Sequence, residues 1–508
     1  MQMNSKITLL MTSDVHACVF PYSYATREEK NQGLARVAHL IDRLKDENTI
    51  VIDNGDVLEG SPLSYYHFQL NRDSENPFTT LMNMVGYDFY NLGNHDFNFG
   101  QEILFDHMNR LQMPCLTANV SYKGQPFSKP YHILKVANKT IALFGIMTHF
   151  VPNWEKEEHI TDMEFHDAFE FTRETVRQIR ENEKADYIIG VYHGGMEKDP
   201  HTGMETEAQT GENQGYRMCT EIEGIDVLLC GHQHHTMLGK LNNTVYIQPF
   251  HDGTELACVE IDTATGEIVP TLLEVTDPPK QELLDYMQEE ENACQQWLDQ
   301  PLGETRIDLT IPDENEARLH KSQVITFLNM VCKDISGADI NANALFLRAK
   351  GFESKITMRD LVSTYIFPNT LMVKKINGRI LKEYLEKSAE FWDVRDGQIA
   401  IEKQHDYPTP QHYNYDMCDG IEYTIKVSNP VGQRIIKLTR NGRDIKEDDV
   451  FTLCINNYRA AGGGGFTMLK EAETVKDIQR NVVEIIADYI NKVKVIDFEP
   501  VNNIKVIL

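Results

Sequence analysis

Residues 7–16 have the sequence Ile-Thr-Leu-Leu-Met-Thr-Ser-Asp-Val-His. A run of apolar and β-forming residues leads directly into Asp14 and His16, which are two positions apart. In an extended chain these two side chains project to the same side. In open α/β sheets, the carboxyl ends of the strands are where side chains converge on a ligand. This stretch therefore predicts a strand that delivers an aspartate and a histidine to a functional site.

The same pattern recurs through the first half of the chain. At least four of the five polar motifs directly follow a β-type run or a turn that closes one. Glycine beside the polar residues permits sharp turns and close backbone approach. The motifs are Asp14-Val15-His16, Gly55-Asp56, Gly93-Asn94-His95-Asp96, His193-Gly194-Gly195 and Gly231-His232-Gln233-His234.

Short apolar runs alternate with amphipathic segments in this half. Leu34, Val37, Leu40, Ile41 and Leu44 have the spacing of one helix face. Strands that alternate with helices indicate βαβ units and a mainly parallel sheet covered on both faces. The predicted strands are Ile7 to Met11, Ile50 to Ile52, Ile141 to Ile146, Tyr187 to Val191 and Val227 to Cys230.

At 508 residues the chain is too long for one compact domain. The alternating pattern stops near Asp277-Pro278-Pro279, and an acidic segment follows that is typical of an exposed joining helix. We expect an α/β domain over residues 1–277, a linker helix over 278–302 and an α+β domain over 303–508.

Periodicity supports the α+β assignment of the second half. Helices are predicted around Val324 to Val331, Ile380 to Phe391 and Val482 to Ile490. Strands are predicted at Tyr423 to Val427 and Ile435 to Leu438, with a tight turn at Asn441-Gly442.

Composition and charge exclude several classes of protein. Hydrophobic residues make up 41% and charged residues 25%, which is ordinary for globular domains and unlike disordered or membrane-spanning chains. The formal net charge of −28 repels nucleic-acid polymers and anionic membranes. Nine scattered cysteines indicate reduced thiols. The short apolar run after Met1 leaves no room for a signal peptide, so we expect a cytoplasmic protein. Oligomeric state stays open.

One histidine after a strand is more often structural than a metal ligand. A set of seven oxygen and nitrogen donors without a thiolate is different, and it suits two divalent ions such as Mn, Fe, Co or Zn. These candidate ligands are Asp14, His16, Asp56, Asn94, His193, His232 and His234.

The five motifs together resemble the calcineurin-like metallophosphoesterases and, more narrowly, the two-domain 5′-nucleotidase family. The resemblance implies that Asp14, His16 and His234 hold one metal, that Asn94, His193 and His232 hold the other, and that Asp56 bridges them. It also makes His95 the catalytic imidazole. The implied reaction is hydrolysis of a nucleotide phosphate ester by a water that the two metals activate. The alternative for His95 is an orienting, structural residue.

Two segments of the second half resemble the family's nucleobase pocket. Tyr365 to Leu371 matches one aromatic wall and Asn456 to Gly465 the other, so the resemblance implies that Phe367 and Tyr458 sandwich a base. Without the family, either aromatic is more simply a core residue. Asn369, Arg348 and Arg459 are further candidate contacts to substrate.

Departures from the family pattern bear on the substrate. Members that act on 5′-nucleotides carry aspartates at the positions of Asn98 and Gly464, and two glycines are lost between Asn343 and Arg348. The chain is more similar to the 2′,3′-cyclic-nucleotide 2′-phosphodiesterase/3′-nucleotidases, also over residues 413–423. This favours opening of 2′,3′-cyclic nucleotides followed by removal of the 3′-phosphate. Alternatives are a 5′-nucleotidase or UDP-sugar hydrolase with the same centre, and a nucleotide-binding sensor whose centre has decayed.

Overall fold

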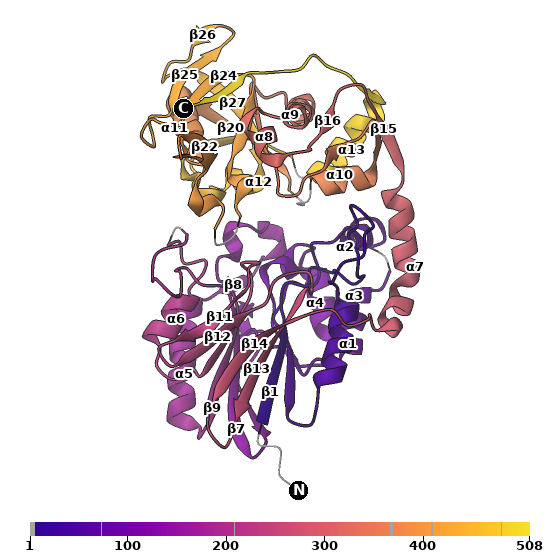
Figure 1. Ribbon diagram of the computed structural model, residues 1–508, viewed down its shortest axis with the longest axis vertical. Coiled ribbons are helices and arrows are strands. Elements are labelled where there is room, and N and C mark those ends of the chain that lie inside the picture. Colours follow the sequence, from indigo (N-terminus) through magenta and orange to yellow (C-terminus); the bar gives the residue numbers. More distant parts are fainter. Residues whose placement is uncertain (1–5, 73, 208, 366–368, 408–409, 479) are drawn as a thin grey trace. The chain divides into compact units, whose positions relative to one another are not determined.

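A computed structural model describes residues 6–72, 74–207, 209–365, 369–407, 410–478 and 480–508. The chain divides into two compact units, Met1–Cys294 and Gln295–Leu508. Each unit has its own sheets and its own buried core (Figure 1). The two units are described separately below.

The first unit contains two large mixed sheets. The first has the strand order β14-β13-β1-β2-β3, with β1 (Lys6–Thr12), β2 (Thr49–Asp53), β3 (Phe89–Tyr90), β13 (Glu255–Asp262) and β14 (Ile268–Glu274). The second has the order β11-β12-β10-β9-β7-β6, with β6 (His132–Val136), β7 (Lys139–Met147), β9 (Tyr187–His193), β10 (Val227–Cys230), β11 (Met237–Leu241) and β12 (Thr244–Gln248). A small sheet joins β4 (Val120–Tyr122), β5 (Gln125–Pro126) and β8 (Met163–Phe165). All five strands predicted in this half are confirmed.

The two large sheets pack face to face, which differs from the single sheet that the sequence predicts. Alternate residues of β1, such as Leu9 and Met11, share one buried cluster with Leu143 and Ile189 of the second sheet. The other face of the second sheet, including Phe144, packs against helices α5 (Ala168–Asn182) and α6 (Gly215–Glu221). A strand that is apolar on both faces fits between two sheets as well as between a sheet and helices, so strand composition alone does not distinguish the two arrangements.

Helices cover the outer faces of this sandwich (Figure 1). The predicted helix at Leu34 is confirmed as α1, which buries Val37, Leu40 and Ile41. Local signals set other helix ends: the Asn76 side chain caps α3, and Gly86 ends it in a left-handed conformation. The helices are α1 (Leu34–Leu44), α2 (Pro62–Tyr65), α3 (Pro77–Val85), α4 (Gln101–Arg110), α5 (Ala168–Asn182) and α6 (Gly215–Glu221). Shorter helical turns span Tyr66–Leu70, Asn94–Phe97, Val151–Asn153 and Glu157–His159.

The acidic segment forms helix α7 (Gln281–Leu298), and the division between the two units falls within it. It is not the exposed helix expected from its charge. Leu283 and Met287 are fully buried, and Glu291 is buried where it accepts a hydrogen bond of 2.6 Å from the Tyr24 hydroxyl. Apolar residues at helical spacing give the helix a packed face beneath its acidic one. The domain boundaries at 277 and 302 stay predictions.

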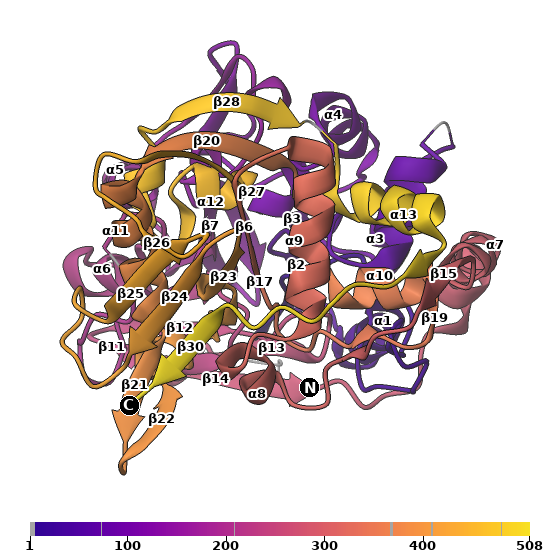
Figure 2. The same ribbon diagram turned by 90° about the horizontal axis from the view of Figure 1, so that it is seen from above.

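The second unit is α+β, as the sequence predicts (Figure 2). Its main sheet has the order β23-β17-β27-β20-β28, with β17 (Ile340–Ala344), β20 (Leu371–Asn377), β23 (Asp416–Asp419), β27 (Val450–Asn456) and β28 (Glu473–Ile478). A second sheet has the order β26-β25-β24-β30, with β24 (Glu422–Lys426), β25 (Ile435–Arg440), β26 (Arg443–Asp444) and β30 (Ile504–Ile507). Smaller sheets contain β15 (Pro301–Thr305), β16 (Leu309–Thr310), β18 (Gly351–Phe352), β19 (Lys355–Thr357), β21 (Trp392–Arg395), β22 (Gln398–Ile401) and β29 (Val495–Ile496).

The helices of this unit are α8 (Glu314–Leu319), α9 (Gln323–Ser336), α10 (Met358–Thr364), α11 (Gly378–Ala389), α12 (Asn457–Ala460) and α13 (Val482–Val493). Short 3₁₀ turns span Lys403–His405, His412–Asn414, Gly463–Gly465 and Thr467–Leu469. Helices α9, α11 and α13 confirm the three that the sequence predicts, and Asn441-Gly442 connects β25 to β26. All nine cysteines are free thiols. Among the residues that the structure describes, no helix has the length and apolarity needed to cross a membrane.

Candidate metal centre

The polar motifs of the first half gather at one end of the sandwich strands. Asp14 and His16 follow β1, Asp56 follows β2, and His193 is the last residue of β9. The loops after β1 and β2 are joined directly, because the Asp14 and His16 amides donate to the carbonyls of Gly55 and Asp56 at 3.0 and 2.8 Å. The sheets therefore bring together side chains that are far apart in sequence.

The first group of candidate ligands is Asp14, His16 and His234. Their ligand atoms all lie within 4.8 Å of one another. The His234 Nε2 atom is 3.4 Å from Asp14 Oδ1 and 2.8 Å from His16 Nε2. Two imidazole nitrogens at that distance cannot both carry a proton toward each other, but both can donate electron pairs to one cation.

The second group is Asp56, His193 and His232, and it obeys the same 4.8 Å limit. His193 Nε2 lies 3.2 Å from Asp56 Oδ2 and 3.3 Å from the side-chain oxygen of Asn94. Asn94 therefore adjoins this group, although its amide is not among the acidic, thiol and imidazole donors that define it. The geometry brings all seven predicted ligands into one region.

Hydrogen bonds fix which ring nitrogen each histidine presents. His16 Nδ1 donates to the Glu59 carbonyl at 2.7 Å, and His193 Nδ1 donates to the Asn54 carbonyl at 2.6 Å. Both rings therefore present Nε2 to the centre. His232 is reversed, because its Nε2 atom bonds to a Glu212 carboxylate oxygen at 3.0 Å and Nδ1 is the atom left over. Such outer partners set the tautomer and orientation of histidine ligands.

The backbone at this centre is unusual. Five of the candidate ligands have a positive φ, between 53° and 75°: Asp14, His16, Asp56, His232 and His234. Left-handed backbone is uncommon outside glycine and costs on the order of 1–3 kcal/mol per residue. Strain of this size concentrated in one set of side chains is a mark of a functional site.

Gly93 is required by close packing at the centre. A Cβ atom added to it would lie 2.1 Å from Asp56 Oδ1 and 2.5 Å from the His193 ring. The glycine of the Gly93-Asn94-His95-Asp96 motif therefore lets that loop approach both side chains, as its place in the sequence motif suggests.

The charges of the buried groups complement one another. Burial by itself raises the pKa of Asp14 and of Asp56, but neighbouring histidines, His193 foremost, outweigh it and hold both pKa values below the usual range. Burial also lowers the pKa of His193, yet Asp56 and Asp14 raise it to about 9. The carboxylates are thus anionic and need positive charge nearby.

The donor set fits divalent cations. Asp56 Oδ2 is fully buried and forms no hydrogen bond within the described residues, although His193 Nε2 lies near it. Carboxylate and amide oxygens combined with imidazole nitrogens are ligands that Mn, Fe, Co and Zn accept. A cation shared among these atoms would give this oxygen a ligand bond in place of the missing hydrogen bond.

Asp96 is a structural residue that sequence reasoning named in its motif without a role. Its two carboxylate oxygens accept from the backbone amides of Gly93, Asp56 and Val57 at 2.8–3.0 Å. It therefore clamps the loop after β2 to the loop after β3. In the sequence, only its place two residues after Asn94 pointed to this role.

His95 lies beside the centre. Its backbone amide donates to Asp56 Oδ1 at 2.7 Å, and its ring centroid is 5.3 Å from that of His16. Its Nδ1 atom faces Asn98 Oδ1 at 2.7 Å and Glu59 Oε2 at 3.1 Å. Burial lowers the pKa of His95, but Asp56 and Glu59 outweigh it and the net pKa lies well above the usual value.

The two predicted pocket segments of the second unit lie side by side. The Thr370 amide donates to the Asn457 side chain, and the Asn457 amide donates to the Thr370 carbonyl, each at 3.0 Å. Tyr458 is half-buried, with its ring 6.1 Å from that of Tyr413. The Asn369 side chain donates to the Tyr365 hydroxyl at 3.3 Å. Phe367 lies outside the described residues.

Arg459 is buried, whereas a side chain that contacts substrate needs to be exposed. It is 2% exposed, and its Nε donates to Asp416 Oδ2 at 2.8 Å. Its Nη atoms donate to the carbonyls of Gly463 and Tyr413, both at 2.7 Å. The guanidinium is therefore engaged by the chain itself. Arg348 is exposed, and its backbone amide donates to Glu314 Oε1 at 2.7 Å.

This arrangement gives residues 413–416 a role that was not visible in the sequence. Together with Asp416 and Tyr413, Asn414 holds the guanidinium of the residue that follows Tyr458. Gly464 has φ 68°, and a Cβ there would lie 2.0 Å from Asn414 Oδ1 and 2.4 Å from Arg459 Nη1. The glycine at position 464 and the segment 413–416 therefore pack against each other around the Arg459 guanidinium.

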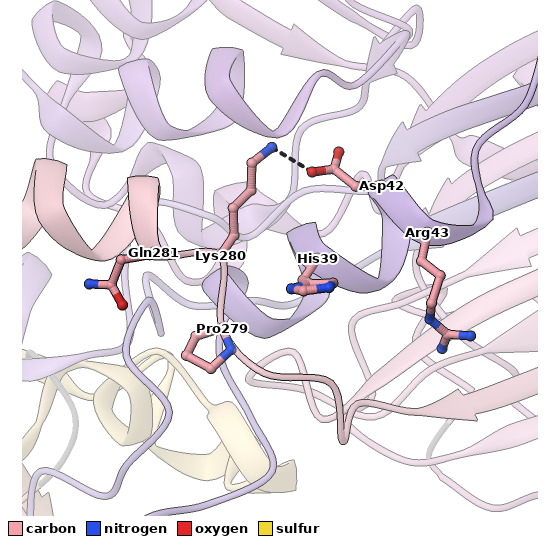
Figure 3. Close-up of a pocket in the computed structure, with 6 residues that line it drawn as sticks. All are labelled: His39, Asp42, Arg43, Pro279, Lys280 and Gln281. Atoms are coloured by element: carbon pink, nitrogen blue, oxygen red, sulfur yellow. Dashed lines mark ion pairs between the residues drawn. The ribbon is translucent and has the colours of Figure 1, made fainter.

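A separate open cavity of about 570 Å³ lies between α1 and the start of α7 (Figure 3). Lys280 and Asp42 on its wall form an ion pair of 2.8 Å, and Arg43 bonds to Asp277. Because its charges are paired and none of the candidate ligands lines it, this cavity is not part of the metal centre.

Comparison with known proteins identifies the family of each half of the chain. The family model for the calcineurin-like phosphoesterases matches residues 7–236, and the model for the 5′-nucleotidase C-terminal domain matches residues 302–471. The trifunctional nucleotide phosphoesterase protein YfkN of Bacillus subtilis is 25% identical over 98% of this chain, which spans 38% of that protein's length.

A 2′,3′-cyclic-nucleotide 2′-phosphodiesterase/3′-nucleotidase of Salmonella typhimurium is 26% identical over 90% of this chain and 81% of its own length. A solved structure of a candidate 5′-nucleotidase from Staphylococcus aureus, in complex with α-ketoglutarate, is 34% identical and covers 99% of this chain and 100% of its own, with a TM-score of 0.93. The chain belongs to the two-domain family of phosphoester hydrolases that joins a calcineurin-like phosphoesterase domain to a 5′-nucleotidase C-terminal domain.

Proposed function

We propose that the chain is a metal-dependent phosphohydrolase that opens 2′,3′-cyclic nucleotides to 3′-nucleotides and then removes the 3′-phosphate. One observation carries the proposal: two groups of three carboxylate and imidazole donors, with Asn94 adjoining the second, meet next to the His95 imidazole. Two cation sites beside an imidazole suit the hydrolysis of a phosphate ester.

Two divalent ions, of Mn, Zn, Fe or Co, would occupy the two groups. Asp14, His16 and His234 would hold the first; Asn94, His193 and His232 would hold the second, and Asp56 would bridge them. Such a pair of ions supplies a water of lowered pKa and neutralises phosphoryl oxygens. Asp56 Oδ2 is buried and has no hydrogen-bond partner among the described residues, and this supports the bridging role.

The chain's own residues supply orientation and a proton carrier. The tautomers of His16 and His193 are set by backbone carbonyls, so the ligand atoms need no reorganisation. His95 is held through Nδ1, which leaves Nε2 as the atom that can face a substrate oxygen. A fixed imidazole beside a phosphate ester can protonate the departing alkoxide.

Two features favour the cyclic and 3′-nucleotide substrates. Asn98 takes the place of an aspartate partner for His95, and Gly464 removes an aspartate from the loop after Tyr458. The Salmonella relative carries the name of that activity. Tyr458, paired with Phe367, would stack on the base.

The principal alternative is a 5′-nucleotidase or UDP-sugar hydrolase with the same centre, because the Staphylococcus structure carries the name of a 5′-nucleotidase. Phosphate release from 2′,3′-cyclic AMP, 3′-AMP and 5′-AMP by the Mn-loaded protein separates the two. The proposal expects the cyclic and 3′-substrates to react faster. Faster release from 5′-AMP would favour the alternative, and no release from any nucleotide would overturn both.

Replacing Asp56 tests the centre and the sensor alternative together. We expect Asp56→Ala to abolish hydrolysis and to lower the bound Mn, with Asp285→Ala, an exposed carboxylate on α7, as the matched control. A nucleotide-binding sensor would instead show no hydrolysis before the substitution and unchanged nucleotide affinity after it.

A further inference from the structure

Glu59 contacts two functional histidines through different atoms. Its backbone carbonyl accepts the hydrogen bond from His16 Nδ1 at 2.7 Å, and its carboxylate Oε2 lies 3.1 Å from His95 Nδ1. The residue is buried, with 9% of its surface exposed. A buried carboxylate this close to an imidazole is a charged partner, not a solvated surface group.

The second neighbour of His95 Nδ1 is neutral. Asn98 Oδ1 lies 2.7 Å from Nδ1, while its amide nitrogen donates to Glu155 Oε2 at 2.5 Å. Because a carboxylate only accepts, Glu155 fixes the Asn98 amide with its oxygen toward His95. Both neighbours of Nδ1 are thus acceptors, so Nδ1 carries the hydrogen and Nε2 is the free atom.

We infer that Glu59 is the acidic positioning residue of His95, in the role for which the resembling 5′-nucleotidases use an aspartate at the position of Asn98. The inference rests on the proposed function, since it names the partner of the imidazole that the reaction would use. Asn98 supplies a directional acceptor, and Glu59 supplies the negative charge from the loop after β2. The His95 ring is therefore oriented by Asn98 from one loop and receives negative charge from Glu59 on another.

Close packing of the loop against His16 fixes the position of Glu59. Gly60 has φ 130°, and a Cβ there would lie 2.6 Å from the His16 Cβ atom. The backbone at 59–60 is therefore pressed against His16, with the Glu59 carbonyl on that ring. The side chain then reaches the neighbouring His95, whose ring centroid is 5.3 Å from that of His16.

Exchange of charge between the two loops tests the inference. Glu59→Gln keeps the size, the backbone carbonyl and a side-chain acceptor but removes the charge. We expect it to lower kcat by roughly 10- to 100-fold with KM changed less than about threefold, the range for outer partners of functional histidines. The Mn content and the melting temperature should match those of the unchanged protein.

The decisive variant is the double substitution Glu59→Gln with Asn98→Asp, which returns the charge to the other side of Nδ1. We expect it to regain most of the lost kcat. Glu102→Gln, at an exposed carboxylate in the first turn of α4, is the matched control. Unchanged kcat in Glu59→Gln, or no recovery in the double variant, would overturn the inference.

Two further readouts keep this result separate from that of the proposed function. Hydrolysis of bis(4-nitrophenyl) phosphate is measured beside the nucleotides, so a protein that cleaves only the artificial diester refutes the proposed substrates and still tests Glu59. The ¹H and ¹⁵N chemical shifts of the His95 Nδ1–H group report the strength of its hydrogen bonds without turnover, and loss of the charged acceptor should move them although Asn98 keeps the tautomer. Should the unchanged protein cleave no ester, identical Nδ1–H chemical shifts in Glu59→Gln and in the unchanged protein would refute the inference.

Discussion

A Glu212 carboxylate oxygen lies 3.0 Å from His232 Nε2, on the side of the ring away from the atom left for a metal. The Glu212 carbonyl is itself anchored by the Thr148 hydroxyl at 2.7 Å, and Trp154 packs 5.5 Å from the His232 ring. His232 is thus held by a carboxylate and an aromatic ring before any cation binds.

Loss of that carboxylate should weaken metal binding. We expect Glu212→Ala to reduce the affinity for Mn or Zn by roughly 10- to 100-fold, and Glu212→Gln to reduce it less because an acceptor oxygen remains. Competition with a metal indicator at fixed pH measures the change. Glu221→Ala, which removes an exposed ion pair with Arg217 on α6, serves as the control. Metal affinity in Glu212→Ala equal to that of the control would contradict the role.

The Arg459–Asp416 pair should matter for stability more than for chemistry. Both side chains are buried, so Arg459→Met leaves Asp416 without its cation, and removal of one partner of a buried pair costs about 3–5 kcal/mol. We expect a matching loss in the free energy of unfolding by urea and a raised KM, because the loop after Tyr458 loses its anchor. Arg443→Met, at an exposed position on β26, is the control. A stable Arg459→Met protein with raised KM alone would instead indicate a direct substrate contact.

An aspartate introduced at position 464 should not convert the substrate preference. Gly464 has φ 68°, and a side chain there would collide with Asn414 and Arg459. We expect Gly464→Asp to lower the melting temperature and to reduce turnover of all nucleotides together. Adding Asn414→Gly should restore part of the stability by opening space. A selective gain on 5′-AMP in the single variant would show that the loop accepts the aspartate without rearrangement.

His107 should make stability depend on pH. Burial, and next the Arg110 cation, lower its pKa to about 3, and it shares a hydrogen bond of 2.7 Å with Thr79. An unfolded histidine titrates near 6.5, so between about pH 6.5 and 3 the unfolded chain binds one more proton. This group therefore removes stability as pH falls below 6.5, by about 1.4 kcal/mol per pH unit.

The comparison is made on metal-free protein, so that loss of ligands does not contribute. From pH 6.5 to 4.5 the unchanged protein should lose roughly 2.3 kcal/mol more unfolding free energy than His107→Asn, which cannot titrate. His320→Asn, at an exposed histidine, should follow the unchanged protein. Parallel curves for His107→Asn and the unchanged protein would refute the assignment.

The sequence by itself determined the elements and the chemistry of the centre. The apolar run before Asp14, the amphipathic spacing of α1 and the Asn441-Gly442 turn depend on neighbours along the chain, and such local patterns report backbone conformation directly. The ligand types were legible for the same reason, since each stands next to a strand end. The buried face of α7 was missed because its acidic residues outweigh its apolar ones in composition.

Only the tertiary structure decided which side chains support that centre. Glu59 beside His95 and Glu212 beside His232 join residues from different loops. It also decided that two sheets stack where one was expected. Such partners are far apart in the sequence and meet only when the strands pair. Which buried charges need a partner is likewise set by the folded structure.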